Sequence, residues 1–113
     1  MENCIFCKII TGQIPATKFY EDDDMVIISD IDPKAKYHYL LLLKEHFPTL
    51  EAMTAKQGEK LAVALKKLPE LAEKLHLEGG YRLVINQGED AGQTVPHLHV
   101  HILAGQKMGW QPA

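Results

Sequence analysis

In Pro96-His97-Leu98-His99-Val100-His101-Ile102-Leu103, three histidines alternate with apolar residues. Alternation with a period of two predicts a β-strand with one buried face, because successive side chains of a strand point to opposite faces. We therefore expect the three imidazoles to form a row on one face of this strand, while the residues between them face the core. The row holds half of the six histidines in the chain, so we interpret it as the functional site.

Length and composition predict one globular domain over residues 1–113, which are 46% hydrophobic and 24% charged. The formal charge of −3, without a basic run, argues against general binding to nucleic acids or membranes. We find no secretory leader and no apolar window near the roughly 20 residues of a membrane helix. Cys4 and Cys7 alone do not form the disulfide framework of a secreted protein. We therefore expect a cytoplasmic protein.

The remaining pattern predicts an α+β domain with a mostly antiparallel sheet of about five strands and a short helix near residues 4–11. The four strands besides the histidine strand are expected at residues 18–20, 25–31, 38–43 and 81–86, with an acidic turn at 21–24.

One long helix is expected after residue 54. Thr54 and Gln57 have the spacing of a capping box, which typically opens a helix. Pro69 should kink or split this helix, because proline removes one intrahelical hydrogen bond. We expect the helix to end at Gly79-Gly80. Its buried face should comprise Leu61, Ala64, Leu65, Leu68, Leu71, Ala72 and Leu75.

The loop from Gln87 to Val95 leads directly into the histidine strand and resembles a phosphate cradle. Gly88 and Gly92 allow the backbone to approach a ligand closely, and Gln93 and Thr94 add polar groups. Histidine has an unperturbed pKa of about 6.5, so near neutrality it is largely a free base and a competent nucleophile. A histidine that attacks phosphorus would form a phosphoramidate intermediate, which water would then cleave.

The histidine stretch resembles the motif of the histidine triad (HIT) superfamily, and further motifs of that superfamily follow in its order along nearly the whole chain. The overall pattern is most similar to the nucleotide-binding, Hint-like branch, whose members are nucleoside phosphoramidases and nucleotide hydrolases. The resemblance implies the HIT-like fold and a homodimer with a continuous sheet across its interface. The further motifs are Asp30-Ile31-Asp32-Pro33, His38-Tyr39-Leu40, Asn86-Gln87-Gly88, Ala91-Gly92-Gln93-Thr94 and Met108-Gly109-Trp110.

The resemblance also implies roles for single residues. His99 would be the nucleophile on the α-phosphorus, and His101 would hydrogen-bond the phosphate. His38 would orient the imidazoles, and Thr94, where the family usually has serine, would protonate the leaving group. The expected substrate-binding residues are Asp30 for the ribose, Asn86, Gly92, Gln93 and Thr94 for the phosphate, Ile5, Phe6, Ile9, Ile28 and Ile31 for the base, and Trp110 in the C-terminal tail.

Cys4 and Cys7 form a two-residue clamp that suits a tetrahedral zinc ion. By itself this pair is also compatible with free buried cysteines or with a redox pair. Some bacterial histidine triad proteins bind structural zinc through such a pair and two histidines, and the matching positions here are His46 and His97. The resemblance therefore implies a structural zinc ion bound by Cys4, Cys7, His46 and His97.

The leading hypothesis is an enzyme that cleaves the α-phosphate bond of purine nucleotide conjugates through a nucleotidyl-His99 intermediate. Alternatives within the family are a dinucleoside polyphosphate hydrolase or a nucleotidyl transferase. A nucleotide-binding regulatory module with little turnover is an alternative of another class. A catalytic metal bound by all three histidines is disfavoured, because residues i and i+4 of a strand lie about 13 Å apart.

Overall fold

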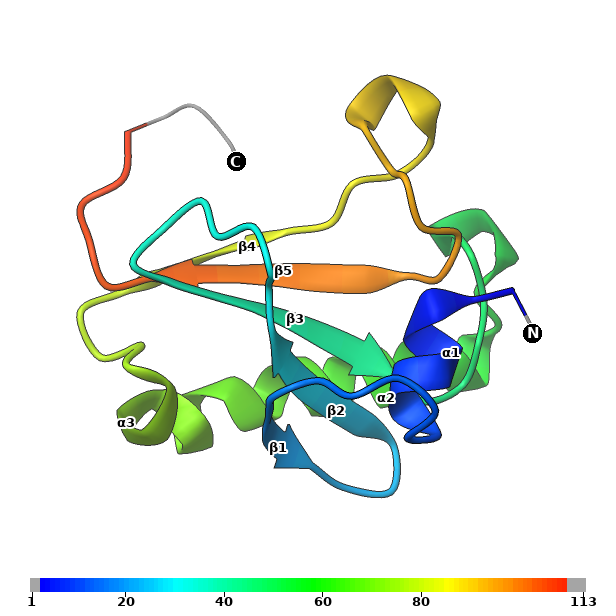
Figure 1. The fold of residues 1–113 in the computed structure, drawn as a ribbon, viewed down its shortest axis with the longest axis horizontal. Helices are drawn as coiled ribbons and strands as arrows, with labels where there is room; N and C mark the ends of the chain where they lie inside the picture. Colours follow the sequence, from blue (N-terminus) through cyan, green and yellow to red (C-terminus); the bar gives the residue numbers. More distant parts are fainter. Residues whose placement is uncertain (1–2, 110–113) are drawn as a thin grey trace.

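The fold is built on one antiparallel sheet with the strand order β1-β2-β3-β5-β4, and the computed structural model describes residues 3–109 (Figure 1). Every neighbouring pair of strands is antiparallel, which confirms the predicted α+β class. The strands are β1 (Lys18–Glu21), β2 (Met25–Ser29), β3 (Tyr37–Leu43), β4 (Tyr81–Val84) and β5 (His99–Ala104). The helices are α1 (Ile5–Ile10), α2 (Ala55–Lys67) and α3 (Ala72–Leu75), with 3-10 turns at Leu50–Ala52, Leu68–Leu71 and Glu89–Ala91.

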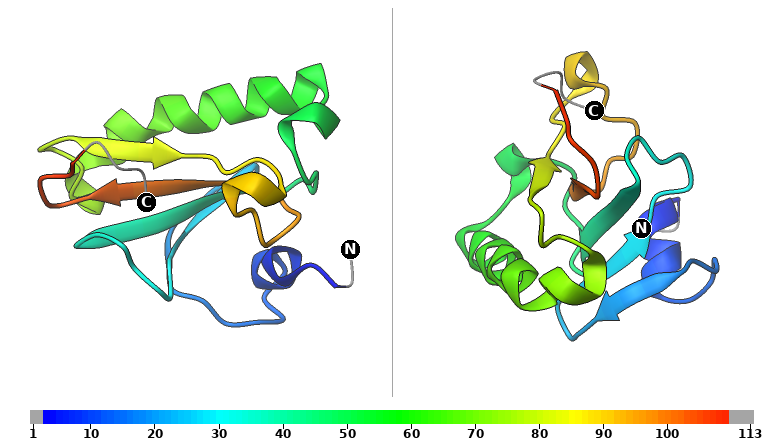
Figure 2. Two further views of the ribbon diagram at one scale, coloured as in Figure 1. Left: turned by 90° about the horizontal axis from the view of Figure 1, so that it is seen from above. Right: turned by 90° about the vertical axis from the view of Figure 1, so that its left-hand side faces the viewer.

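The two faces of the sheet are covered differently. The long helix α2 lies along one face, and α1 lies on the other (Figure 2). On the α2 side, Leu41, Val100 and Ile102 pack with Leu61 and Leu68, all of them buried. On the α1 side, a smaller core contains Cys4, Phe6, Ile9, Val26, Ile28, Leu40 and Leu42. The second face is therefore only partly filled by apolar side chains, which leaves room there for polar groups.

The long helix begins as predicted and is divided at Pro69. The Thr54 side chain accepts from the Gln57 N–H, and the Gln57 side chain accepts from the Thr54 N–H, so both halves of the capping box are present. A 3-10 turn that contains Pro69 separates α2 from α3. The helix ends earlier than expected, because His76 adopts the left-handed conformation with φ 60° at the C-cap of α3.

The strand β5 begins at His99, so the prediction that His97 lies in the same strand is wrong. A tight turn precedes the strand, in which the His97 N–H donates to the Val95 carbonyl at 2.8 Å. Pro96 lies inside this turn and has no N–H to add to the sheet. The alternation still holds from Leu98 onward, since Leu98, Val100 and Ile102 are all buried in the α2-side core.

Other strand boundaries differ by a few residues from those predicted. β2 ends at Ser29 and β4 at Val84, each two residues earlier than expected. The acidic turn at 21–24 is confirmed as a hairpin, in which an Asp22 carboxylate oxygen accepts from the N–H groups of Asp24 and Met25. None of the helices within residues 3–109 combines the length and hydrophobicity needed to cross a bilayer.

Replacing Thr54 with Ala should reduce the free energy of unfolding by about 1 kcal/mol, because it removes the oxygen that caps α2. Urea denaturation measures this change. Thr49→Ala is the matched control, since Thr49 precedes a 3-10 turn but makes no capping hydrogen bond with its side chain. Equal losses in the two variants would contradict the importance of the capping box.

Candidate active site

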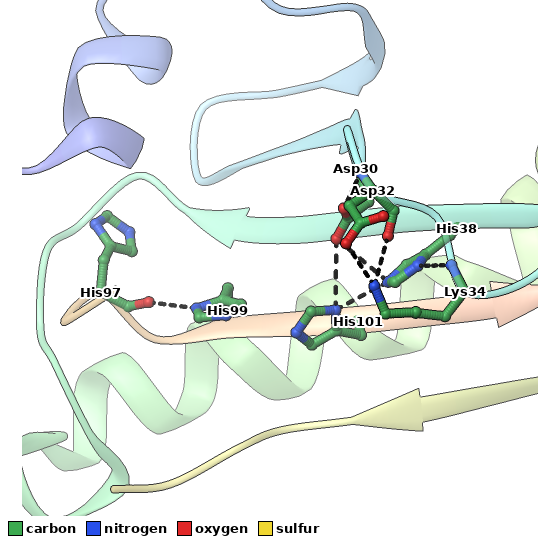
Figure 3. Close-up of polar contacts among 7 residues, drawn as sticks. All are labelled: Asp30, Asp32, Lys34, His38, His97, His99 and His101. Carbon is green, nitrogen blue, oxygen red and sulfur yellow. Dashed lines mark hydrogen bonds and ion pairs between the residues drawn. The ribbon is translucent and has the colours of Figure 1, made fainter. Parts of the chain in front are cut away.

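The strand register brings three histidines together on the α1 side of the sheet. In the pairing of β3 with β5, Leu40 lies opposite His101 and Leu42 lies opposite His99. His38 is two residues before Leu40 and shares its face, so it is the diagonal neighbour of His101. The rings of His99 and His101 lie 5.1 Å apart, and those of His38 and His101 lie 5.2 Å apart. His97 is not part of this group, and its ring points away from the other rings (Figure 3).

The hydrogen bonds of His38 assign the tautomers of two histidines. The Lys34 backbone N–H donates to His38 Nδ1 at 2.9 Å, so Nδ1 is unprotonated and Nε2 carries the proton of the neutral ring. His38 Nε2 lies 2.9 Å from His101 Nδ1, to which it therefore donates. His101 must then carry its own proton on Nε2. The chain of contacts from Lys34 through His38 leaves His101 with one N–H for a further acceptor (Figure 3).

The opposite assignment holds for His99. Its Nδ1 lies 2.7 Å from the carbonyl oxygen of His97 and must donate to it, because a carbonyl oxygen can only accept. The proton of the neutral ring is thus on Nδ1, and Nε2 keeps its lone pair. The edge of the Phe6 ring packs against His99, with the ring centroids 5.0 Å apart. His99 is therefore held as a base or nucleophile next to the donor His101.

Burial favours the neutral forms of the two histidines beside His99. Burial, followed by the neighbouring His99 and His38, lowers the pKa of His101 to about 4 against the opposing effect of Asp30. Burial also lowers the pKa of His38, while the Asp30 carboxylate 3.4 Å from His38 Nε2 opposes this shift. Both rings are therefore neutral near pH 7, as the hydrogen-bond chain requires.

A cavity of about 460 Å³ opens beside these rings, and most of the predicted site residues line it. It has an apolar wall from α1 and β2 and a polar wall from the loop before β3 and the loop before β5. Ile31 projects from its rim and is 99% exposed. The lining residues are Ile5, Phe6, Ile9, Ile28, Ser29, Asp30, Ile31, Asp32, Lys34, His38, Leu40, Asn86, Gly92, Thr94, Val95, His99 and His101.

One of the predicted binding residues is placed differently from the others. Gln93 does not line the cavity with the others, because its side chain accepts from the Gly88 N–H and donates to the Pro48 carbonyl. These bonds fix the loop that carries Gly92 and Thr94, so the Gln93 side chain shapes the cavity from behind. Trp110 lies outside the described residues.

The sequence interpretation missed the part played by Lys34. Its N–H sets the tautomer of His38, and its side chain reaches the rim of the cavity, where it contacts Asp32. The signal available in the sequence was the position of Lys34 directly after Asp32-Pro33, because proline has a fixed φ and so restricts the turn that leads to Lys34.

The four predicted metal ligands, which include the ring of His97, form a cluster that is separate from the group of His38, His99 and His101. Cys4 Sγ and Cys7 Sγ lie 3.4 and 3.6 Å from His97 Nδ1, and Cys7 Sγ lies 3.3 Å from His46 Nδ1. All four ligand atoms are within 4.8 Å of one another. Tetrahedral zinc with sulfur and nitrogen ligands requires separations of roughly 3.3–3.8 Å, so these residues fit such an ion.

The hydrogen bonding of His97 supports this fit. Its Nε2 lies 3.0 Å from the Leu43 carbonyl oxygen and donates to it, which leaves a lone pair on Nδ1. That lone pair faces His46 Nδ1 at 3.1 Å and both sulfurs, with no carboxylate among the four ligands. Burial, followed by the neighbouring Cys4, raises the pKa of the Cys7 thiol to about 11. The thiol is therefore protonated near pH 7, and a cation that binds to its sulfur would displace that proton.

Asp30, His38 and His101 also lie close enough to hold a cation, with ligand atoms 2.9 to 3.8 Å apart. Their hydrogen bonds do not suit this role. A metal ion on His38 Nε2 needs the lone pair there, but the N–H of Lys34 already occupies the Nδ1 lone pair and fixes the proton on Nε2. This group is therefore better described as a chain of hydrogen bonds.

Comparison with known proteins finds solved structures with a similar fold. The crystal structure of a HIT family hydrolase from Legionella pneumophila Philadelphia 1 is similar, with a TM-score of 0.91 and 42% identity, and the alignment covers 98% of this chain and 100% of that one. A Zn-bound histidine triad family protein from Mycobacterium smegmatis has a TM-score of 0.80 and 30% identity over 99% of this chain and 84% of that one. A histidine triad nucleotide-binding protein from Candida albicans has a TM-score of 0.80 and 31% identity, over 98% and 85% of the two chains.

The profile of the HIT domain matches residues 11–108, which include both histidine-bearing strands and the loops around the cavity. Cys4 and Cys7 lie before the matched region. The match covers most of the chain and agrees with the similar structures, of which the Legionella pneumophila hydrolase is 42% identical. The chain belongs to the HIT domain family.

Proposed function

We propose that the protein is a nucleotide hydrolase that cleaves the α-phosphate bond of purine nucleotide conjugates, with nucleoside phosphoramidates as the leading substrate class. The observation that carries the proposal is the pair of opposite tautomers at His99 and His101 beside one cavity. One ring offers a lone pair and its neighbour offers an N–H, which is what attack on a phosphate requires. The HIT family hydrolase from Legionella pneumophila supports the hydrolase class.

In the first step, His99 Nε2 would form a bond to the α-phosphorus while the bond from phosphorus to the leaving group breaks. The leaving amine or alkoxide would take a proton from the Thr94 hydroxyl, which lines the cavity. In the second step, water would add to phosphorus and return a proton to the Thr94 oxygen, while the bond from phosphorus to Nε2 breaks and the nucleoside monophosphate is released. His99 Nδ1 keeps its proton throughout and donates it to the His97 carbonyl oxygen, and this hydrogen bond keeps the ring oriented.

The remaining cavity residues would bind the nucleotide. His101 Nε2–H, Asn86 and the backbone near Gly92 would hydrogen-bond the phosphate oxygens, and Asp30 would accept from the ribose hydroxyls. The base would lie against the apolar wall formed by Ile5, Phe6, Ile9, Ile28 and Ile31. The nucleotide-binding name of the Candida albicans protein supports a nucleotide as the ligand.

A cytoplasmic location remains a prediction that cell fractionation would test.

Rapid quenching of a reaction with adenosine 5′-tryptamine phosphoramidate should reveal a nucleotidyl adduct on the intact protein that maps to His99. His99→Asn should abolish the adduct and the release of AMP, because the amide lacks a nucleophilic lone pair. His76→Asn is the matched control, since His76 stacks on Tyr37 outside the cavity and asparagine also tolerates its left-handed backbone.

Two other results would favour the alternatives. Tight binding of the phosphoramidate without release of AMP would favour a regulatory module. Cleavage of a dinucleoside polyphosphate, or nucleotidyl transfer to a sugar phosphate, at a much higher kcat/KM would favour the corresponding member of the family.

We also propose that Cys4, Cys7, His46 and His97 bind one structural zinc ion, which would fix α1 to the turn before β5. The fit of the four ligand atoms supports this assignment, as does the Zn-bound protein from Mycobacterium smegmatis. His46→Gln should reduce zinc from about one ion per chain to nearly none by elemental analysis, with a lower melting temperature. His76→Gln should retain the ion, and equal zinc contents in the two variants would exclude this site.

A homodimer formed through the outer edge of β4 completes the proposal. β4 is an edge strand, and its Tyr81 and Leu83 side chains are 38% and 40% exposed. Leu83→Asp should shift the mass in sedimentation experiments from two chains toward one, because a charge would be buried at the interface. Val63→Asp alters an exposed residue of α2 and should leave the mass unchanged. A wild-type mass of one chain would refute the dimer.

A further inference from the structure

The cavity contains one permanent cation among its described lining residues, the ammonium group of Lys34. The carboxylates of Asp30 and Asp32 line the same cavity, and His38 and His101 are neutral near pH 7 because burial lowers their pKa values. The loop before β5, residues 86–95, carries Glu89 and Asp90 but no lysine or arginine. A bound α-phosphate would therefore meet N–H donors, and a second negative charge would have only Lys34 as a cationic partner.

The backbone of Lys34 is fixed by hydrogen bonds, whereas its ammonium group contacts only the exposed Asp32, through a carboxylate oxygen at 2.6 Å and the carbonyl oxygen at 3.2 Å. The Lys34 N–H is bound to His38 Nδ1, and the loop on either side is tied down by two further bonds. Asp30 accepts from the Asp32 N–H at 2.8 Å, and the Lys36 N–H donates to Gln106. The Lys34 side chain itself is 53% exposed and extends along the rim. The attachment point is thus set relative to the histidines, and the charge keeps the reach of a flexible side chain.

The ion pair that now holds the ammonium group is easily exchanged. Lys34 Nζ lies 2.6 Å from Asp32 Oδ2, and the Asp32 side chain is 86% exposed. The Lys34 ammonium beside it holds the pKa of the Asp32 carboxyl below its usual range. Because water can solvate Asp32 when the pair opens, the exchange of Asp32 for a ligand anion costs little.

The place of Lys34 along the site is also informative. His97 and α1 lie at one end of the histidine groups, and Lys34 lies with Asp30, Asp32 and His38 at the other end (Figure 3). The apolar wall that would hold the base includes α1. A nucleotide with its α-phosphate at His99 and His101 and its ribose at Asp30 would have its sugar and the groups attached to it near Lys34. The ammonium group is near enough to these histidines to contribute to the lowered pKa of both His38 and His101.

We infer that Lys34 is a specificity-determining residue that releases Asp32 and pairs with a second phosphate group of the bound nucleotide. This inference rests on the proposed nucleotide site and adds a preference for nucleotides that carry a second phosphate group. The second phosphate could be attached to the α-phosphate, as in a nucleoside diphosphate unit, or to the ribose next to Asp30. Both sources share the chemistry that an ammonium group recognises.

Isothermal titration calorimetry with three probes tests the inference: AMP, α,β-methylene-ADP and adenosine 3′,5′-bisphosphate. At least one of the two bisphosphates should bind wild-type protein about 10-fold more tightly than AMP, as a charge-assisted contact with phosphate would provide. The preferred probe identifies where the second phosphate is attached. The ratio of affinities should fall as salt is raised, because the pair is partly exposed.

Lys34→Gln should bring the ratio of affinities close to one, since it removes the charge and retains a polar side chain of similar length. Lys36→Gln is the matched control, because the Lys36 ammonium group lies near the Tyr37 ring and does not line the cavity. Lys36→Gln should keep the wild-type ratio.

Three outcomes would overturn the inference. In the first, both bisphosphates bind wild-type protein no more tightly than AMP. In the second, the preference for a bisphosphate over AMP persists in Lys34→Gln. In both cases, binding of AMP would still support the nucleotide site. If none of the three nucleotides binds, the proposed function fails together with the inference. The control with AMP therefore separates the two failures.

Discussion

The register between β3 and β5 is the constraint on which the site depends. It sets Leu40 opposite His101 and Leu42 opposite His99, and so places His38 diagonally across from His101. A slip by one residue would turn every side chain of β5 to the other face of the sheet. The histidines would then enter the core beneath α2, and Val100 would face the cavity. The buried core on the α2 side therefore fixes the geometry of the polar face.

His97 connects the two sites of the molecule through different atoms. Its ring lies among Cys4, Cys7 and His46, while its carbonyl oxygen accepts from His99 Nδ1. The turn before β5 makes this division possible, because it removes the His97 side chain from the face of the strand while its carbonyl stays beside His99. One residue thus belongs to the cysteine cluster and also determines the tautomer of the proposed nucleophile.

The cavity is suited to a phosphate although its permanent charge is net negative. Burial keeps His38 and His101 neutral, and neutral imidazoles donate one hydrogen bond each without requiring a counter-charge. Recognition of the α-phosphate would then depend on the directions of N–H groups, which the hydrogen bonds behind them fix. The single ammonium group of Lys34 is held at the rim, where water still solvates it.

The sequence by itself determined the features that depend on near neighbours in the chain. These include the alternation from Leu98 onward, the capping box at Thr54 and the break at Pro69, because strand period, capping and proline geometry are local. The predicted roles of single residues came from resemblance and stay predictions. Only the tertiary structure decided that His97 leaves the row and which ring nitrogen of each histidine carries its proton. Such assignments depend on partners that are distant in the chain, such as His38 and His101, which are 63 residues apart and meet only when the sheet forms.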